Sequence, residues 1–258
     1  MRIAREEQFV THDGTCLCYR HWPALATAAE PRAIVLLHRG HEHSGRLQHV
    51  VDELALSEFA LFAWDARGHG RSPGARGDSP SFGALVKDLD HFVRHIDKRH
   101  GISTGNIAVV GQSVGAVLAA TWAHDYAPLV RCLVLTAPAF QVRLYVPLAR
   151  PGLALLQRLF GNFFITSYVK PGLLTRDPER VRSYDEDPLV TRAISARVLL
   201  GLYDAGERIV ADAAAIRLPL QLLISGKDWV VHRAPQERFF ARLGSPVKER
   251  HLLADFLH

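Results

Sequence analysis

The chain has 258 residues, of which 48% are hydrophobic and 22% are charged, which fits one ordinary globular domain rather than a disordered or fibrous protein. Its formal net charge is +5, but most of the positive charge is scattered arginine. Since no basic stripe is interleaved with aromatic residues, we expect no binding to nucleic acid.

The start of the chain and the cysteines bear on cellular location. Residues 1–10 contain no apolar run, so we expect no secretory signal, and no apolar stretch is long enough to span a bilayer. The three cysteines, Cys16, Cys18 and Cys132, are too few and of odd number for a disulfide framework. We therefore expect a cytoplasmic protein.

Segments with strand-like patterns alternate with segments of helical spacing. The expected strands are 16–22, 33–37, 61–64, 107–111, 132–136, 220–225 and 247–252. The expected helices between them are 47–55, 82–96, 114–126 and 236–243. The third to sixth strand segments are continuous apolar runs, which are typical of parallel strands covered on both faces. The pattern predicts an α/β fold with a mostly parallel central sheet and helices on both faces.

The alternation breaks between residues 139 and 206. Helical patterns at 148–160, 178–183 and 194–202 are joined by loops rich in proline and glycine, and no strand pattern is evident. We expect a core formed by residues 1–138 and 207–258, with residues 139–206 as a helical cap insertion over the site. The alternative is a set of extra core helices packed at one edge of the sheet.

The strand-like segment 107–110 leads into Gly111-Gln112-Ser113-Val114-Gly115 and then into a helical segment. The run Gly-x-Ser-x-Gly is a modest signal alone, but this position is that of a nucleophile elbow. The turn is so sharp that flanking side chains would clash, which favours glycine on both sides. We therefore expect Ser113 to be the nucleophile of a serine hydrolase with the α/β-hydrolase fold.

A serine hydroxyl needs a base, and that base needs an acid to orient it. On this fold the acid and the histidine follow the serine in that order, each after a later strand. Asp228 follows segment 220–225 and is the best candidate for the acid; the alternative is an aspartate that caps a helix or a turn. His258 follows the last strand segment and is the expected base, while His251 lies inside that segment and is expected to be structural.

The loop at residues 38–46 should supply part of the oxyanion hole. We expect the backbone N–H of Gly40, or less favourably of Arg39, to act together with the N–H of Val114. Three histidines and a glutamate in this loop suggest a metal site, but a compact loop would have to aim several ligands inward, so we expect none. The glycine-containing run at residues 65–72 is expected to support the site from nearby.

Four blocks in this order resemble monoacylglycerol lipases and the related bacterial lysophospholipases, which are hydrolases of the serine aminopeptidase S33 type. They are the loop 38–46, the run 65–72 with the pattern D-x-x-G-H-G-x-S, the elbow 111–115 and the acid loop 225–228, followed by Phe256-Leu257-His258. The chain is also similar to the hydrolase half of bacterial proteins in which such a domain precedes a methyltransferase.

The resemblance implies a hydrolase without a cofactor or a metal that acts on monoacylglycerols, lysophospholipids and related small acyl esters. Apolar residues of the insertion would line an acyl channel or touch a membrane, which would make the protein peripheral to it; packing in the core of the cap is an equal alternative. These residues are Leu153, Leu155, Leu156, Leu159, Phe160, Phe163 and Phe164.

The chain departs from the family at two points. The family usually has His-Gly where this chain has His38-Arg39, and a cation there would narrow the site or bind an anionic head group. The family also continues past its histidine into a final helix, whereas this sequence stops at His258. We therefore expect either a fragment of a longer protein, in which a methyltransferase domain would follow, or a truncated product.

Three hypotheses follow from the sequence. The first is an acyl-ester hydrolase that uses Ser113, His258 and Asp228. The second is a catalytically weak domain that serves as a fusion or binding partner, suggested by Arg39 and by the position of His258. The third is a thioesterase or a peptidase on the same fold, because the triad alone does not separate these reactions.

Overall fold

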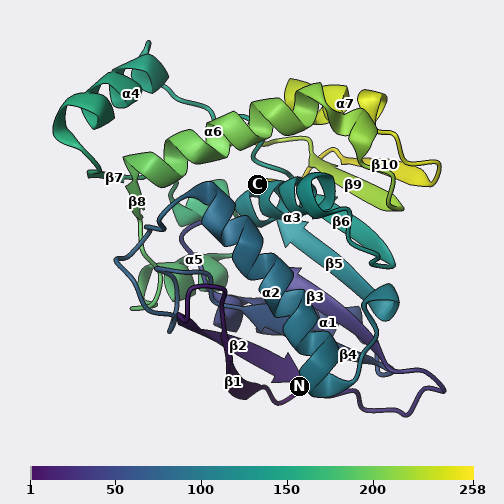
Figure 1. Cartoon of the computed structure of the whole chain (residues 1–258). Helices are drawn as coiled ribbons and strands as arrows, with labels where there is room; N and C mark the ends of the chain where they lie inside the picture. Colours follow the sequence, from purple (N-terminus) through teal and green to yellow (C-terminus); the bar gives the residue numbers. More distant parts are fainter. Residues whose placement is uncertain (1) are drawn as a thin grey trace.

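The computed structural model describes residues 2–258, which contain an eight-stranded sheet in the order β1-β2-β4-β3-β5-β6-β9-β10 (Figure 1). Strand β2 pairs antiparallel with β1 and β4, and the remaining neighbours pair in parallel. The mostly parallel sheet predicted from the sequence is confirmed. The strands are β1 (Arg5–Val10), β2 (Cys16–Trp22), β3 (Arg32–Leu37), β4 (Phe59–Trp64), β5 (Ile107–Gln112), β6 (Cys132–Thr136), β9 (Leu220–Ser225) and β10 (Lys248–Leu253).

Helices cover both faces of the sheet, as predicted, but unequally. Helices α2, α3 and α7 pack on one face with α6 lying across them, and they enclose the main core. Helix α1 covers the other face with a smaller cluster around Trp22 and Val51. The helices are α1 (Gln48–Leu54), α2 (Phe82–His100), α3 (Val114–Tyr126), α4 (Ala149–Phe160), α5 (Pro178–Asp185), α6 (Ala196–Ala211) and α7 (Arg233–Arg242), with short 3-10 turns η1 (Ser44–Leu47), η2 (Thr104–Asn106), η3 (Pro171–Leu173) and η4 (Ala213–Ala215).

The unequal cover shows in neighbouring residues of the same strands. Leu135 in β6 and Leu222 in β9 point into the main core and are fully buried. Val134 and Leu223, one position along on the opposite face, are only half-buried. Parallel strands are normally covered on both faces. Within residues 2–258, β6 and β9 are fully covered on one face only.

Three strands are missed by the sequence patterns. Charged residues dominate β1 and only Phe9 is buried, so no apolar alternation marks this strand. The expectation of no strand within 139–206 is wrong, because β7 (Phe164–Thr166) and β8 (Ala193–Ser195) pair with each other there. Strands of three residues are held by tertiary contacts and are too short to show a period.

The segment 139–206 contains α4, β7, η3, α5, β8 and the first part of α6, between β6 and β9. Helix α4 projects from the rest of the molecule at the upper left of Figure 1, and none of its residues is buried. The division into a core and a cap remains a proposal, since its second boundary falls within α6, which packs on α3. Between residues 2 and 258, no helix has the length and apolar character needed to cross a membrane.

Candidate active site

Ser113 lies at the sharp turn between β5 and α3. Its backbone angles, φ 55° and ψ −113°, are rare for a residue other than glycine, and such strain costs on the order of 1–3 kcal/mol. A Cβ at Gly111 would lie 2.5 Å from the carbonyl oxygen of Gly115, and a Cβ at Gly115 would lie 2.7 Å from those of Leu37 and His38. These close approaches explain both glycines and position Ser113 at the carboxyl ends of the parallel strands.

Three of the predicted side chains form one hydrogen-bonded series. The Oγ atom of Ser113 lies 2.6 Å from Nε2 of His258, and Nδ1 of His258 lies 2.8 Å from Oδ2 of Asp228. All three residues are buried, and Asp228 and His258 reach Ser113 from the loops after β9 and β10. In such an arrangement one imidazole nitrogen can take the serine proton while the carboxylate holds the other nitrogen. The competing residue His251 is exposed in β10 and pairs with Glu249 at 3.6 Å.

The second oxygen of Asp228 is held by the backbone. Its Oδ1 atom accepts hydrogen bonds from the N–H groups of Val230 and Val231 at 2.8 and 2.9 Å. Burial alone would raise the pKa of the Asp228 carboxyl, but the hydrogen bond and charge of His258, with these two N–H groups, outweigh burial and lower the pKa. Asp228 is therefore a carboxylate at neutral pH and can orient the imidazole.

The two predicted oxyanion donors lie against each other. A Cβ at Gly40 would lie 3.1 Å from Cγ2 of Val114, so Gly40 packs against the side chain of the residue that follows Ser113. Within residues 2–258, neither backbone N–H donates a hydrogen bond. Val114 is also the first residue of α3, where the helix dipole favours negative charge. The position next to Ser113 is therefore suited to an oxyanion.

Arg39, where the resembling family has glycine, forms two specific contacts. Its Nε atom lies 2.9 Å from Oε2 of the buried Glu42, and its Nη1 atom donates a hydrogen bond of 3.3 Å to a main-chain oxygen of His258. Glu42 also lies 3.5 Å from Nε of Arg46. The charge of Arg39 is thus balanced by Glu42, and its side chain links the oxyanion loop to the backbone of His258.

The histidines of the oxyanion loop are not gathered around one point. Nδ1 of His38 bonds the carbonyl oxygen of Arg39, and Nε2 of His43 bonds Oδ2 of Asp187 at 2.9 Å. Across the described residues, 2–258, the only group of three or more residues with metal-ligand spacing lies elsewhere, and none of its members comes from this loop. The bond to Asp187 instead ties the loop to the segment after α5.

The run at residues 65–72 supports the oxyanion loop, as predicted. Oδ1 of Asp65 accepts a hydrogen bond from the N–H of Ser44 at 2.7 Å, and its Oδ2 accepts one from the N–H of Arg71 at 2.8 Å. A Cβ at Gly70 would lie 2.3 Å from Oδ2 of Asp65, which explains that glycine. The aspartate thus joins the two loops without contacting Ser113 directly.

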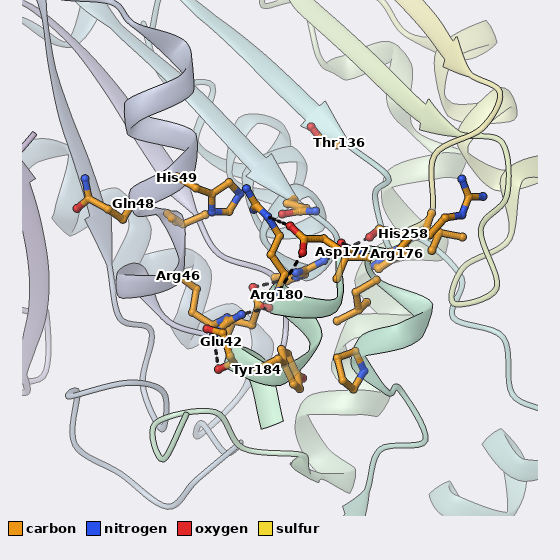
Figure 2. Close-up of a pocket in the computed structure, with 18 of the residues that line it drawn as sticks. Glu42, Arg46, Gln48, His49, Thr136, Arg176, Asp177, Arg180, Tyr184 and His258 are labelled. Carbon is orange, nitrogen blue, oxygen red and sulfur yellow. Dashed lines mark hydrogen bonds and ion pairs between the residues drawn. The ribbon is translucent and has the colours of Figure 1, made fainter. Parts of the chain in front are cut away.

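Two cavities adjoin the site. An open cavity of about 1110 Å³ reaches His258 and is lined by charged side chains, which include Glu42, Arg46 and Arg180 (Figure 2). A smaller, apolar cavity of about 70 Å³ lies behind Gly40 and Val114. Its walls include Trp64, Phe82, Leu85, Leu118, Ile194, Val198 and Leu202. A cavity with many charged side chains thus reaches His258, and a small apolar cavity reaches Gly40 and Val114.

Most of the apolar residues of the insertion lie on the surface, neither in an acyl channel nor in the core of the cap. Five of the seven are exposed, so packing in the core of the cap is wrong for them, and none of the seven lines either cavity beside the site. The exposed ones are Leu155, Leu156, Leu159, Phe160 and Phe164. Contact with a membrane through this surface stays a prediction.

Sequence reasoning missed the contacts that join the oxyanion loop to the insertion. Besides the bond from His43 to Asp187, the guanidinium of Arg46 bonds the backbone oxygen of Ser183 and lies over the ring of Tyr184. More than 130 residues separate these partners along the chain. The four blocks single out Arg46 and His43, but nothing in their spacing indicates where their partners lie.

Comparisons with known proteins agree with this architecture. The model of the family described as serine aminopeptidase, S33, matches residues 29–258. The Escherichia coli (strain K12) protein named "Uncharacterized protein YnbC" is 60% identical over 257 residues, which cover 100% of this chain and 44% of that protein. The chain thus spans less than half the length of this relative.

Two monoacylglycerol lipases are also similar. That of Mycolicibacterium smegmatis is 28% identical over 259 residues, covering 93% of this chain and 85% of that protein. The crystal structure of Paleococcus ferrophilus monoacylglycerol lipase has a TM-score of 0.77 and 25% identity, covering 97% of this chain and 88% of the other. These similarities in sequence and structure establish the α/β-hydrolase fold.

Proposed function

The chain belongs to the serine aminopeptidase S33 family and is an α/β-hydrolase similar to monoacylglycerol lipases, and on this premise we propose that it hydrolyses acyl esters through an acyl-enzyme on Ser113. The observation that carries the proposal is the series from Ser113 through His258 to Asp228, next to two N–H groups without a partner in residues 2–258.

Each residue has one role in the proposed reaction. Ser113 Oγ attacks the acyl carbonyl carbon while His258 takes the hydroxyl proton, and the N–H groups of Gly40 and Val114 stabilise the oxyanion. His258 then gives the proton to the leaving alkoxide, and the C–O bond to the alcohol breaks. Water attacks the acyl-enzyme as His258 takes its proton, which releases the acid and restores Ser113.

The two cavities suggest where the two parts of the ester lie. The polar cavity reaches His258, which must protonate the leaving alcohol, so the alcohol lies there. The acyl group lies in the apolar cavity behind Gly40 and Val114. Ligand pockets usually measure roughly 300–1,000 Å³, and this cavity of about 70 Å³ has Val198 and Leu202 of α6 in its wall. Short acyl groups therefore fit, and longer ones require α6 to move.

A series of p-nitrophenyl esters tests the cavity assignment. We expect kcat/KM to be highest for acetyl or butyryl esters and to fall for octanoyl and lauroyl esters. Leu202→Ala should shift the optimum towards longer chains, since it enlarges the cavity. A lauroyl optimum in the unaltered protein would contradict this assignment without affecting the proposed triad.

Parallel assays on glycerol esters, lysophospholipids, acyl-CoA thioesters and peptides test the reaction class. We expect the folded chain to hydrolyse oxygen esters, and Ser113→Ala to lose this activity. Turnover of thioesters or peptides in preference to esters would favour the third hypothesis. Equal activity in Ser113→Ala would refute the proposal.

A further inference from the structure

A second cluster of histidines lies far from Ser113. Glu7 in β1, His21 in β2 and His100 at the end of α2 each offer one ligand atom, and these three atoms all lie within 4.8 Å of one another. Glu7 is opposite Tyr19 and His21 is opposite Phe62 of β4, so the cluster lies on the side of the sheet formed by β1 and β2. Ser113 lies instead directly after β5, and the proposed hydrolysis uses none of these residues. We propose that Glu7, His21 and His100 form a binding site for a zinc ion.

The distances are close to those that zinc requires. Tetrahedral zinc, with bonds of roughly 2.0–2.2 Å, holds its ligand atoms about 3.3 Å apart. Nδ1 of His21 lies 3.1 Å from Oε1 of Glu7, and Nε2 of His100 lies 4.0 Å from Oε2 of Glu7. A zinc ion would take Nε2 of His100 away from its 3.0 Å contact with the Tyr19 hydroxyl and bring it closer to Glu7.

Neighbouring aromatic groups hold these ligands in place. The ring of His21 stacks on that of Phe62, with centroids 4.5 Å apart and an angle of 6° between the planes. The hydroxyl of the buried Tyr19 donates a hydrogen bond of 2.9 Å to Oε2 of Glu7 and lies 3.0 Å from Nε2 of His100 and 3.2 Å from Nε2 of His95. Partners of this kind orient the ligands of metal sites and strengthen binding.

The protonation states also suit a metal. Burial lowers the pKa of His21, and burial together with the charge of His21 lowers the pKa of His100 to about 4. Burial alone would raise the pKa of Glu7, but hydrogen bonds from Tyr19 and His21 outweigh it and lower the pKa. At neutral pH the cluster thus offers two neutral imidazoles and one carboxylate. The nearby charges of Arg5 and Arg99 help to keep the imidazoles unprotonated.

The cluster is partly exposed. The side chains of Glu7 and His100 are 24% and 13% exposed, so an ion from solution can reach them. Two imidazoles, a carboxylate and a water form a common zinc environment. A bound ion would join β1 and β2 to the end of α2, and it would stabilise the folded chain because it binds only that state.

Metal titration of the folded 258-residue chain tests the site. After treatment with EDTA and its removal, the protein is titrated with Zn²⁺ in competition with a chromophoric chelator, and separately with Co²⁺ followed by visible absorption. We expect one equivalent of Zn²⁺ to bind, a tetrahedral Co²⁺ spectrum and a rise in Tm. His21→Gln and Glu7→Gln should each weaken binding at least about 100-fold, and Tyr19→Phe about 10–100-fold.

Matched controls separate this cluster from other histidine pairs. His251→Gln removes a histidine that also lies near a glutamate, Glu249, and should leave binding unchanged. His258→Ala should leave it unchanged as well, which excludes binding at the other buried pair. If His21→Gln does not fold, His100→Gln replaces it, because this residue lies at the end of a helix. The absence of saturable Zn²⁺ binding, or equal binding in the ligand variants, would overturn the proposal.

Discussion

Two imidazole–carboxylate pairs lie in separate parts of the molecule, one in the loops after β9 and β10 and the other on β1 and β2. His258 and Asp228 are 2.8 Å apart, and His21 and Glu7 are 3.1 Å apart. The second nitrogen of His258 faces the hydroxyl of Ser113, and Asp228 accepts two backbone N–H groups. Glu7 instead accepts a hydrogen bond from Tyr19, and His21 packs against a second imidazole, that of His100.

A histidine bonded to a carboxylate does not by itself define a function. A histidine bonded to a carboxylate becomes a general base where its free nitrogen meets a nucleophile and where unpaired N–H groups can hold the developing charge. The same pair becomes a candidate ligand set where a further imidazole faces it. The neighbours of the pair therefore decide between proton transfer and coordination.

The largest expected effect is on catalysis, and it distinguishes Asp228 from Glu7. Asp228→Asn should lower kcat for ester hydrolysis by about 10⁴-fold, because the amide cannot hold His258 in the required tautomer. Glu7→Gln should leave kcat unchanged within error. Steady-state kinetics on p-nitrophenyl butyrate measure both variants, and circular dichroism controls for folding. Similar losses of kcat in the two variants would show that Glu7 and Asp228 do not differ in their roles in catalysis.

A second, smaller effect concerns the backbone of His258. Arg39 donates a hydrogen bond to a main-chain oxygen of His258, so Arg39→Gly should loosen His258 and lower kcat by up to about 100-fold, as for a small misplacement of a reacting group. The same change leaves the buried Glu42 with one partner fewer and should destabilise the fold by about 1.5–3 kcal/mol.

Arg176→Gly provides the matched control for Arg39. Arg176 is an exposed arginine that lines the same polar cavity, and this variant should keep both kcat and the unfolding midpoint in urea. An increase in activity for Arg39→Gly would show instead that the arginine obstructs the site, as the hypothesis of a catalytically weak domain holds.

The smallest expected effect is a change in acid sensitivity. Below about pH 6.5 an unfolded chain binds a proton on His100, whereas the folded chain holds the pKa of His100 at about 4. The unfolded state therefore binds more protons, so this histidine makes the fold less stable as the pH falls from about 6.5 towards 4. In EDTA, the Tm of His100→Gln should fall less steeply over this range.

The exposed His251 again provides the control for the acid experiment. Tm values of His251→Gln should follow those of the unaltered chain from pH 7 to pH 4.5. A slope for His100→Gln equal to that of the unaltered chain would contradict the buried, neutral state inferred for this imidazole.

The pair near Ser113 was predictable from the sequence, whereas the pair at Glu7 was not. Ser113, Asp228 and His258 each follow a strand segment in an order that this fold requires, so strand ends could be used to place them. Glu7 lies in the strand that no apolar pattern marks. Its contact with His21 depends on the register of β1 against β2, in which Glu7 is opposite Tyr19, and His100 arrives through the packing of α2.

The same reasoning explains the outcome in the insertion. Helices α4 and α5 begin within one residue of their predicted starts, since proline and helical spacing mark them locally. Ile165 of β7 and Ile194 of β8, which pair with each other, are 29 positions apart in the sequence, and no local pattern reports such a pairing. Elements that depend on residues nearby in the sequence, such as α4 and α5, could therefore be predicted. Elements that depend on distant partners, such as β7 and β8, could not.

Covalent labelling tests most directly whether Ser113 is the nucleophile. The folded chain is treated with a fluorophosphonate probe, and the modified residue is identified by mass spectrometry of its peptides. We predict one adduct per chain, located on Ser113, with none in Ser113→Ala and slower labelling in Asp228→Asn. A folded chain that hydrolyses esters but carries no adduct on Ser113 would show that Ser113 is not the nucleophile.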